Sequence, residues 1–163
     1  MAINSDQLKE IERSYLADNI IRKHNKLIRN EIRKLGANSY DLLLPETHLL
    51  PIIVQPKEII NGIVYGRYKQ DNSHKEPIRG RGLLLATDRR VILVDHKPLF
   101  LRCLEYPYRT IGGISYGKVG TLITIKLYSR VGNLSITTAN SRAADKFVSV
   151  IQNSIETEGV KGA

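Results

Sequence analysis

The sequence has few of the features that would assign it to a membrane-spanning, exported or disulfide-bonded class of protein. Cys103 is the only cysteine, which excludes an internal disulfide, and we interpret its thiol as a small core residue in a reducing compartment. No run of about 18 apolar residues offers a membrane span. Charged residues between Asp6 and Arg13 stand where a secretory signal would be apolar. We therefore expect a cytoplasmic protein.

The sequence also offers little catalytic or metal-binding chemistry. Its four histidines fall on different predicted elements without metal-ligand spacing, so we expect no metal and no cofactor. Gly112, Gly117 and Lys118 have the spacing of a phosphate-binding loop. Val119, however, lacks the hydroxyl that would bind magnesium, and a strand follows where that motif needs a helix. We therefore expect that the chain is not an enzyme.

Positive charge is what the chain has in excess. It carries 25 Lys and Arg against 16 Asp and Glu, for a net charge of +9. Such a balance favours an acidic partner, which could be nucleic acid, an anionic membrane surface or an acidic protein face. The tyrosines fall at positions suited to packing, and no recognition-helix signature occurs, which argues against nucleic acid.

Apolar residues recur at helical spacing from Ser5 to Leu35, and Gly36 can end such a helix. Its apolar stripe must be buried against protein, either the rest of the chain or a second copy. The stripe lacks Trp and Phe, and the polar residues beside it mix both signs, which favours a protein contact over a membrane surface. We therefore predict an interaction helix whose stripe includes Ile11, Ile21, Ile28 and Ile32.

From Glu58 onward the periodicity becomes that of short strands separated by turn residues. The predicted strands are 59–68, 81–86, 90–95, 99–105, 111–116, 122–128 and 132–137. A helix with a cap at Asn140 or Ser141 is predicted to follow and to end near Glu156.

Seven strands followed by one helix is the layout of a pleckstrin-homology (PH) domain, and two local segments strengthen the resemblance. The run from Gly82 to Val94, GLLLATDRRVILV, resembles the second and third strands of bacterial PH-like domains. The run from Tyr106 to Ile111, YPYRTI, resembles that family's step into a later strand. The resemblance implies a mainly β fold, a seven-stranded antiparallel barrel capped by the C-terminal helix and preceded by the long amphipathic helix.

On this basis we divide the chain into three parts. Residues 1–57 form the N-terminal helix and a Pro-rich connector packed on or beside the barrel, 58–157 form the PH-like barrel with its capping helix, and 158–163 form a disordered tail. The resemblance covers about 58–155 and does not explain the N-terminal helix.

The resemblance also indicates a candidate ligand site. In lipid-binding PH domains, a Lys and a later basic-x-Arg pair across the first hairpin grip inositol phosphates, and Lys69, Arg79 and Arg81 have that arrangement. Residues two apart on a strand share a face, and guanidinium groups bind phosphate oxygens in pairs. The loop also contains Asp71 and Glu76, so the alternatives are a nonspecific attraction to anionic surfaces and a solvated basic loop with no lipid role.

Two functional hypotheses result. The first is a non-catalytic interaction or assembly module that binds a protein partner or associates with itself. The alternative is a module that binds anionic phospholipid or phosphoinositide headgroups through the three basic residues.

Overall fold

The computed structural model describes residues 5–72 and 74–161, apart from some side chains, mainly in the N-terminal helix. In chain order the elements are α1 (Ser5–Lys34), the short 3-10 helix η1 (Asp41–Leu43), α2 (Pro45–Ile53), β1 (Ile60–Asn72), β2 (Lys75–Thr87), β3 (Arg90–Lys97), β4 (Phe100–Pro107), the 3-10 helix η2 (Tyr108–Thr110), β5 (Ile111–Val119), β6 (Leu122–Ser129), β7 (Leu134–Thr138) and α3 (Ser141–Lys161). The predicted mainly β fold with flanking helices is confirmed. None of the described helices is both long and apolar enough to cross a membrane.

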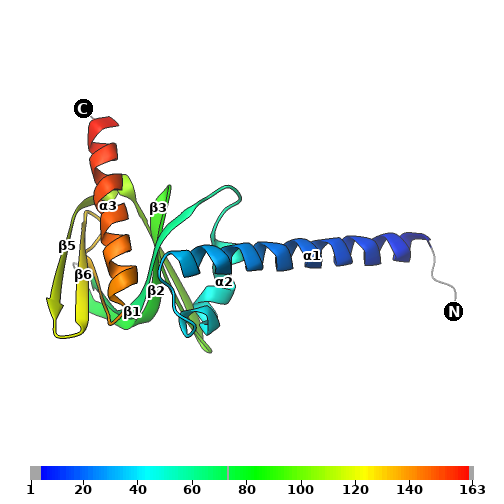
Figure 1. Ribbon diagram of the computed structural model, residues 1–163, viewed down its shortest axis with the longest axis horizontal. Coiled ribbons are helices and arrows are strands. Elements are labelled where there is room, and N and C mark those ends of the chain that lie inside the picture. Colours follow the sequence, from blue (N-terminus) through cyan, green and yellow to red (C-terminus); the bar gives the residue numbers. More distant parts are fainter. Residues whose placement is uncertain (1–4, 73, 162–163) are drawn as a thin grey trace.

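The seven strands form one antiparallel sheet in the order β4-β3-β2-β1-β7-β6-β5. This sheet bends around α3 (Figure 1), but its edge strands β4 and β5 do not pair with each other, so the predicted barrel is not closed. β4 ends at Pro107, and the short helix η2 separates it from the start of β5. Tyr108 of η2 is buried in the same apolar cluster as the inward side chains of α3.

The concave side of the sheet holds the main apolar core. Leu84 of β2, Leu93 of β3 and Ile125 of β6 face Phe147 and Ile151 of α3, and all five side chains are fully buried. Phe147 and Ile151 therefore face the sheet.

The helix α3 extends past the predicted end near Glu156. Ser154 and Thr157 donate hydrogen bonds to carbonyl oxygens one turn earlier, and no proline follows to stop the helix. Residues 158–161, assigned to a disordered tail from the sequence, continue this helix, and residues 162–163 lie outside the described residues.

The other side of β1, β2 and β3 is covered by the end of α1 and by α2. Ile28 and Ile32 of α1 and Leu50 of α2 belong to a second apolar cluster with strand residues that point away from α3, among them Leu83, Leu85, Ile92 and Val94. The central parts of β2 and β3 are therefore buried on both faces, which accounts for their uninterrupted apolar runs.

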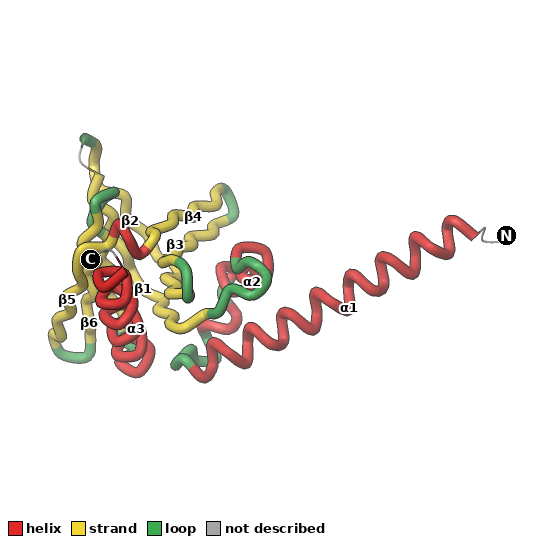
Figure 2. The backbone as a smooth tube through the Cα atoms, turned by 90° about the horizontal axis from the view of Figure 1, so that it is seen from above, coloured by secondary structure: helices red, strands yellow, loops and turns green. Residues whose placement is uncertain are grey.

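Most of α1 lies away from the sheet, and only its C-terminal end approaches the rest of the chain (Figures 1 and 2). Ile28 and Ile32 are buried, as the apolar stripe predicted, whereas the side chains of Ile11 and Ile21 lie outside the described residues. Gly36, in the left-handed region at φ 104°, ends the helix, and its carbonyl accepts a hydrogen bond from Asn140 Nδ2 at 2.8 Å.

An ion pair fastens the connector to the sheet. Arg90 of β3 donates from Nε and Nη2 to the two carboxylate oxygens of Glu58, each at 2.9 Å, and from Nη2 to the Ile53 carbonyl at 3.0 Å. Burial alone would raise the pKa of Glu58. The hydrogen bonds from Arg90, the Gln55 N–H and the Thr87 hydroxyl outweigh burial and lower this pKa from 4.5 to about 2.

The interpretation of Cys103 as a core residue is wrong. Cys103 is exposed, because it lies on the edge strand β4 opposite Val94 and points to the side away from α3. Its neighbour Leu101 is exposed as well, whereas Leu104 is partly buried against the main core.

Candidate functional site

The three predicted basic residues lie together on the hairpin of β1 and β2. Both strands continue past their predicted ends, so Lys69 and Arg79 are strand residues that face each other directly. Arg67 faces Arg81 in the same way. Because directly opposed residues of antiparallel strands point to the same side, the four cations share one surface. We call Arg67, Lys69, Arg79 and Arg81 the basic face.

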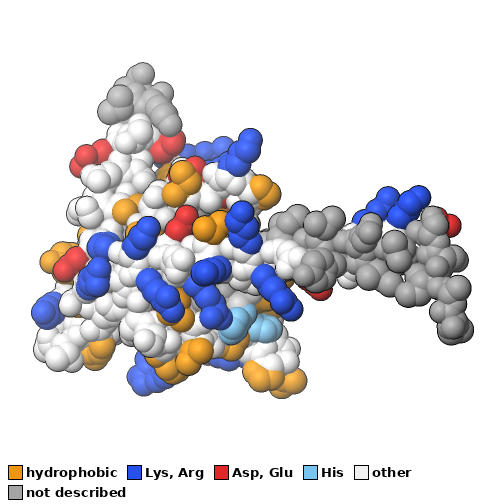
Figure 3. All heavy atoms as spheres, turned by 45° about the vertical axis from the view of Figure 1, so that its right-hand side comes forward, with side chains coloured by type: hydrophobic (Ala, Val, Ile, Leu, Met, Phe, Trp, Pro, Cys, Tyr) orange, Lys and Arg blue, Asp and Glu red, His pale blue; other side chains and the backbone are white. Residues whose placement is uncertain are grey.

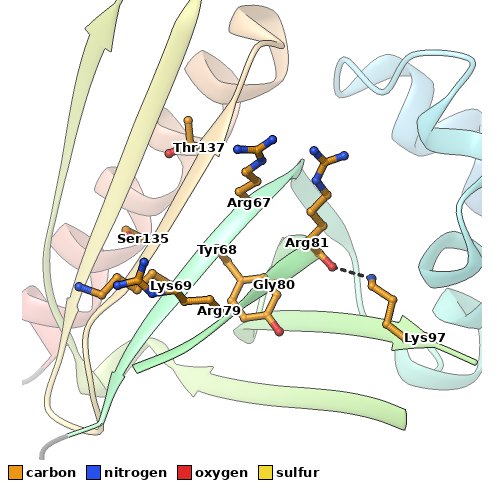
Figure 4. A pocket seen from close by; sticks show the side chains of 9 residues that line it. All are labelled: Arg67, Tyr68, Lys69, Arg79, Gly80, Arg81, Lys97, Ser135 and Thr137. Atoms are coloured by element: carbon orange, nitrogen blue, oxygen red, sulfur yellow. Dashed lines mark hydrogen bonds between the residues drawn. The ribbon is translucent and has the colours of Figure 1, made fainter. Parts of the chain in front are cut away.

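The basic face lines an open hollow of about 580 Å³. Figure 4 shows Arg67 and Arg81 side by side, with Lys69 and Arg79 farther toward the hairpin turn. On the neighbouring strand β7, Thr137 is opposite Arg67, and Ser135 is opposite Lys69. The hollow is therefore lined by the four cations of the basic face, by Lys97 and by the hydroxyl groups of Ser135 and Thr137. Its size is within the range of small-ligand sites, about 300–1,000 Å³.

The cations of the basic face are poorly neutralised by the protein. Lys69 Nζ is 3.3 Å from Asp71 Oδ1, and both side chains are about half exposed. Asp71 is the one acidic partner of this face among the residues that the structure describes. Like charges that face each other across two strands destabilise a sheet. An anion bound in the hollow would relieve this repulsion.

A buried polar network stands behind the hollow. Lys97 at the end of β3 donates to the Arg81 carbonyl at 2.9 Å (Figure 4) and lies 2.7 Å from Asp95 Oδ1. It also lies 3.4 Å from Glu46 of α2. Burial would lower the pKa of Lys97, but the two carboxylates raise it. Lys97 is thus already paired with carboxylates, and it links Glu46 of α2 to the backbone of β2 at Arg81.

Tyr68 of β1 belongs to the same network. Its hydroxyl donates to Asp95 Oδ2 and accepts from Arg102 Nη1 at 2.6 Å. Burial, followed by the bond to Asp95, raises the pKa of Tyr68 to about 12. This phenol therefore stays protonated at neutral pH and acts as a fixed hydrogen-bond donor.

Glycine residues set the two arginines of β2 in place. A Cβ atom on Gly80 would lie 2.6 Å from Asp95 Oδ2, and one on Gly82 would lie 2.7 Å from the Val94 carbonyl. The pattern Arg79-Gly80-Arg81-Gly82 thus puts close packing on one side of the strand and cations on the other. This alternation of Arg and Gly is a sequence signal for the site that the spacing of Lys69, Arg79 and Arg81 did not use.

A second group of cations follows one side of α1 near its C-terminal end. Arg22, Lys26, Arg29 and Arg33 recur at helical spacing and line a shallow hollow with His48 of α2. Figure 3 shows many Lys and Arg side chains and few acidic ones over the part of the molecule next to α1. This part of α1 is therefore more basic than the mixed charge predicted for the whole helix.

The bent antiparallel sheet with a helix in its concave side is the fold of PH domains. The sequence model of the bacterial PH domain family matches residues 54–153, which is more than half of the chain. The protein belongs to this family, and the predicted resemblance is confirmed.

Solved structures with the same fold are distant in sequence. The N-terminal PH domain of Vps36 is 17% identical, with 66% of this chain and 86% of that chain covered and a TM-score of 0.50. A DUF1696 family protein with a pleckstrin-homology domain from Shewanella loihica PV-4 is 16% identical, with coverages of 73% and 94% and a TM-score of 0.46. At such identities the likeness concerns the fold alone. A search of curated proteins gave no match.

Proposed function

We propose that the protein is a non-catalytic binding module that attaches to anionic phospholipid headgroups through the basic face. The observation that carries the proposal is the pairing of Arg67 with Arg81 and of Lys69 with Arg79 in an open hollow, where Asp71 is their one acidic partner within the described part of the chain. The repulsion within such a cluster costs stability, which a phosphate-bearing ligand would recover.

The chemistry of the hollow suits phosphate oxygens. Guanidinium groups donate two parallel hydrogen bonds to one phosphate, and the hydroxyls of Ser135 and Thr137 can donate at the rim. Among the residues that the structure describes, those lining the hollow include no histidine, cysteine or carboxylate that could act as a base or nucleophile, which supports binding over catalysis. We place the module at the cytoplasmic leaflet, where anionic lipids give the membrane its negative surface potential.

The attraction can be estimated from the number of cations. A Lys or Arg near an anionic membrane contributes about 1 kcal/mol, so the four residues would contribute about 4 kcal/mol. Since about 1.4 kcal/mol corresponds to tenfold in affinity, this is nearly a thousandfold. The attraction should weaken strongly with added salt, because all four side chains are accessible to solvent.

Self-association through α1 is the second candidate, and it corresponds to an assembly role. Its support is the position of α1, which lies away from the sheet for most of its length (Figure 2). Among the residues with described side chains, the first half carries Asp6, Glu10 and Asp18 beside Lys9 and Arg13, and the second half carries the basic group with Glu31. Two copies in antiparallel arrangement would therefore place the more acidic half of one helix against the basic half of the other.

Vesicle co-sedimentation combined with sedimentation velocity separates the two candidates. The full chain should sediment with phosphatidylserine-containing vesicles at about 0.1 M salt and not with phosphatidylcholine vesicles. Binding to both kinds of vesicle, or to neither, would contradict the lipid proposal. A concentration-dependent dimer without vesicle binding would favour assembly instead.

A further inference from the structure

The register of the sheet continues the basic face onto the strands β7, β6 and β5. Direct pairing aligns a first row of side chains across five strands, namely Ser115, Lys126, Ser135, Lys69 and Arg79. A second row, two residues along each strand, consists of Gly117, Thr124, Thr137, Arg67 and Arg81. Both rows lie on the side of the sheet away from α3, because residues between them, such as Ile125 and Ile136, pack against α3. We call these two rows the open sheet face.

Helices cover this side of the sheet only in part. The apolar cluster under α1 and α2 takes its strand residues from β1, β2 and β3. Over β5 and β6, Ser115 and Thr124 are exposed and Lys126 is partly exposed. Neighbouring strands are about 4.8 Å apart, so each row spans about 19 Å. The two rows therefore form a broad strip that a ligand can reach from solvent.

The open sheet face is positive and rich in hydroxyl groups. Its cations are Lys126 and the four of the basic face, and the two rows, whose positions are all described, contain no acidic residue. Figure 4 shows the hydroxyl-bearing Ser135 and Thr137 of β7 next to the basic face. The Thr137 hydroxyl is in turn 2.9 Å from that of Thr124 on β6. Lys, Arg, Ser and Thr side chains repeated along a strip suit a chain of phosphates better than a single phosphate.

Aromatic rings lie at two places beside these phosphate-binding groups. Tyr128 follows Lys126 on the same side of β6 and is 42% exposed, which departs from the packed position predicted for the tyrosines. Lys126 Nζ is 5.3 Å from the centre of its ring. Tyr65 and Leu122 line a second hollow, of about 390 Å³, which shares Arg67 with the hollow of the basic face. Both places offer a flat apolar surface next to a cation.

A single strand of nucleic acid fits this combination better than an acidic peptide. Both ligands would match the cations, but a peptide carboxylate would leave the aromatic rings without a partner. Bases stack on aromatic side chains of open sheets while basic residues follow the phosphate backbone. The width of the strip corresponds to the smaller sites of single-strand-binding domains, about 4 nucleotides.

We infer that the open sheet face binds single-stranded nucleic acid. The phosphates lie along the two rows, one base stacks on Tyr128, and another occupies the hollow of Tyr65 and Leu122. The inference goes beyond the proposed lipid binding. It shares the four cations of the basic face with that proposal but also depends on Lys126 and Tyr128, which lie outside the basic face.

Fluorescence anisotropy with labelled oligonucleotides tests this binding on the full chain. Oligothymidylate and oligouridylate of about 10 nucleotides should bind more tightly than a duplex of equal length at about 0.1 M salt, and the tighter of the two identifies DNA or RNA. A merely basic surface would prefer the duplex, because a duplex carries more charge per length. Tighter or equal binding of the duplex, or no binding at all, would overturn the inference.

A pair of lysine variants tests the position of the phosphates. Lys126→Ala should lower the slope of log affinity against log salt by about 0.7, the value for one phosphate contact of a single strand. Lys118→Ala is the matched control, because Lys118 pairs with Ile123, which faces α3, and its loss should leave the slope unchanged. Equal changes in the two variants would contradict a track of phosphates along the open sheet face.

Tyrosine variants test the stacking of bases without changing the charge. Tyr128→Ala should weaken single-strand binding about fivefold or more, whereas Tyr128→Phe, which keeps the ring, should bind as the unmodified chain does. Tyr116→Ala is the control, since Tyr116 is 56% exposed but pairs with Ile125 on the α3 side. Equal losses in Tyr128→Ala and Tyr116→Ala, or a loss in Tyr128→Phe as large as in Tyr128→Ala, would overturn stacking on this ring.

Two further measurements separate this inference from other ligands. Tyr128→Ala should bind phosphatidylserine-containing vesicles as the unmodified chain does, because no cation is removed. Single-strand binding by a chain that binds no vesicles would support this inference and contradict the lipid proposal. Oligoglutamate that displaces the oligonucleotide at equal charge concentration would show a site for acidic peptides and overturn the inference.

Discussion

Replacement of Glu58 by Gln should remove a defined part of the protein's stability. The Glu58 side chain is completely buried against Arg90, and its pKa is lowered from 4.5 to about 2. One pKa unit corresponds to about 1.4 kcal/mol, so this carboxylate contributes about 3 kcal/mol at neutral pH. Because the folded-state pKa is depressed, the contribution is complete above about 4.5 and is lost as the pH falls through about 2.

Urea unfolding at a series of pH values measures this effect. We expect Glu58→Gln to be about 3 kcal/mol less stable than the unmodified chain at about pH 7, with a difference that shrinks steadily below about pH 4.5. Glu105→Gln is the matched control. Glu105 contacts the same Arg90 guanidinium, but 55% of its side chain is exposed, so its loss should cost less than about 1 kcal/mol. Equal losses in the two variants, or a difference that does not change with pH, would refute the assignment.

Three further substitutions test packing by denaturant unfolding. Phe147→Ala should cost about 3–5 kcal/mol, because the ring is fully buried under the sheet, and a loss below about 1 kcal/mol would contradict that position. Ile32→Ala should cost about 2–5 kcal/mol if the end of α1 packs on the sheet, and an unchanged midpoint would show that it does not. Gly80→Ala should cost about 1–3 kcal/mol through its clash with Asp95, whereas Gly117→Ala, with no atom within 4 Å of the added Cβ, should change stability by less than about 0.5 kcal/mol.

The strands could be predicted because their apolar alternation and turn residues are local signals. The extension of the β1–β2 hairpin could not, because Asn72 and Pro77 are typical of loops. Pro77 is accommodated since the outer part of β2 extends beyond its pairing with β3, which begins at Leu83. Closure of the sheet depends on the distance between its edge strands β4 and β5, and no sequence pattern indicates that distance.

The packing of α1 and α2 on the sheet and the composition of the candidate site could also be predicted only in part, because both depend on contacts between residues far apart in the sequence. The uninterrupted runs Leu83–Ala86 and Val91–Val94 indicate burial on both faces, but they cannot say that α1 and α2 provide the cover. Spacing selected Lys69, Arg79 and Arg81, whereas the position of Arg67 directly opposite Arg81 could be known only from the register of the hairpin. Cys103 was misplaced because periodicity does not tell an edge strand from a central one.

The most direct test of the central claim compares vesicle binding of two double variants with equal loss of charge. Arg79→Ala with Arg81→Ala removes two cations of the basic face, and Arg109→Ala with Arg142→Ala removes two exposed cations from η2 and α3. At about 1 kcal/mol for each cation, the first variant should bind phosphatidylserine-containing vesicles about 30-fold more weakly at low salt, and the second should lose less than about threefold. Equal losses in the two variants would contradict a site at the basic face and leave only a general attraction of a basic protein to an anionic surface.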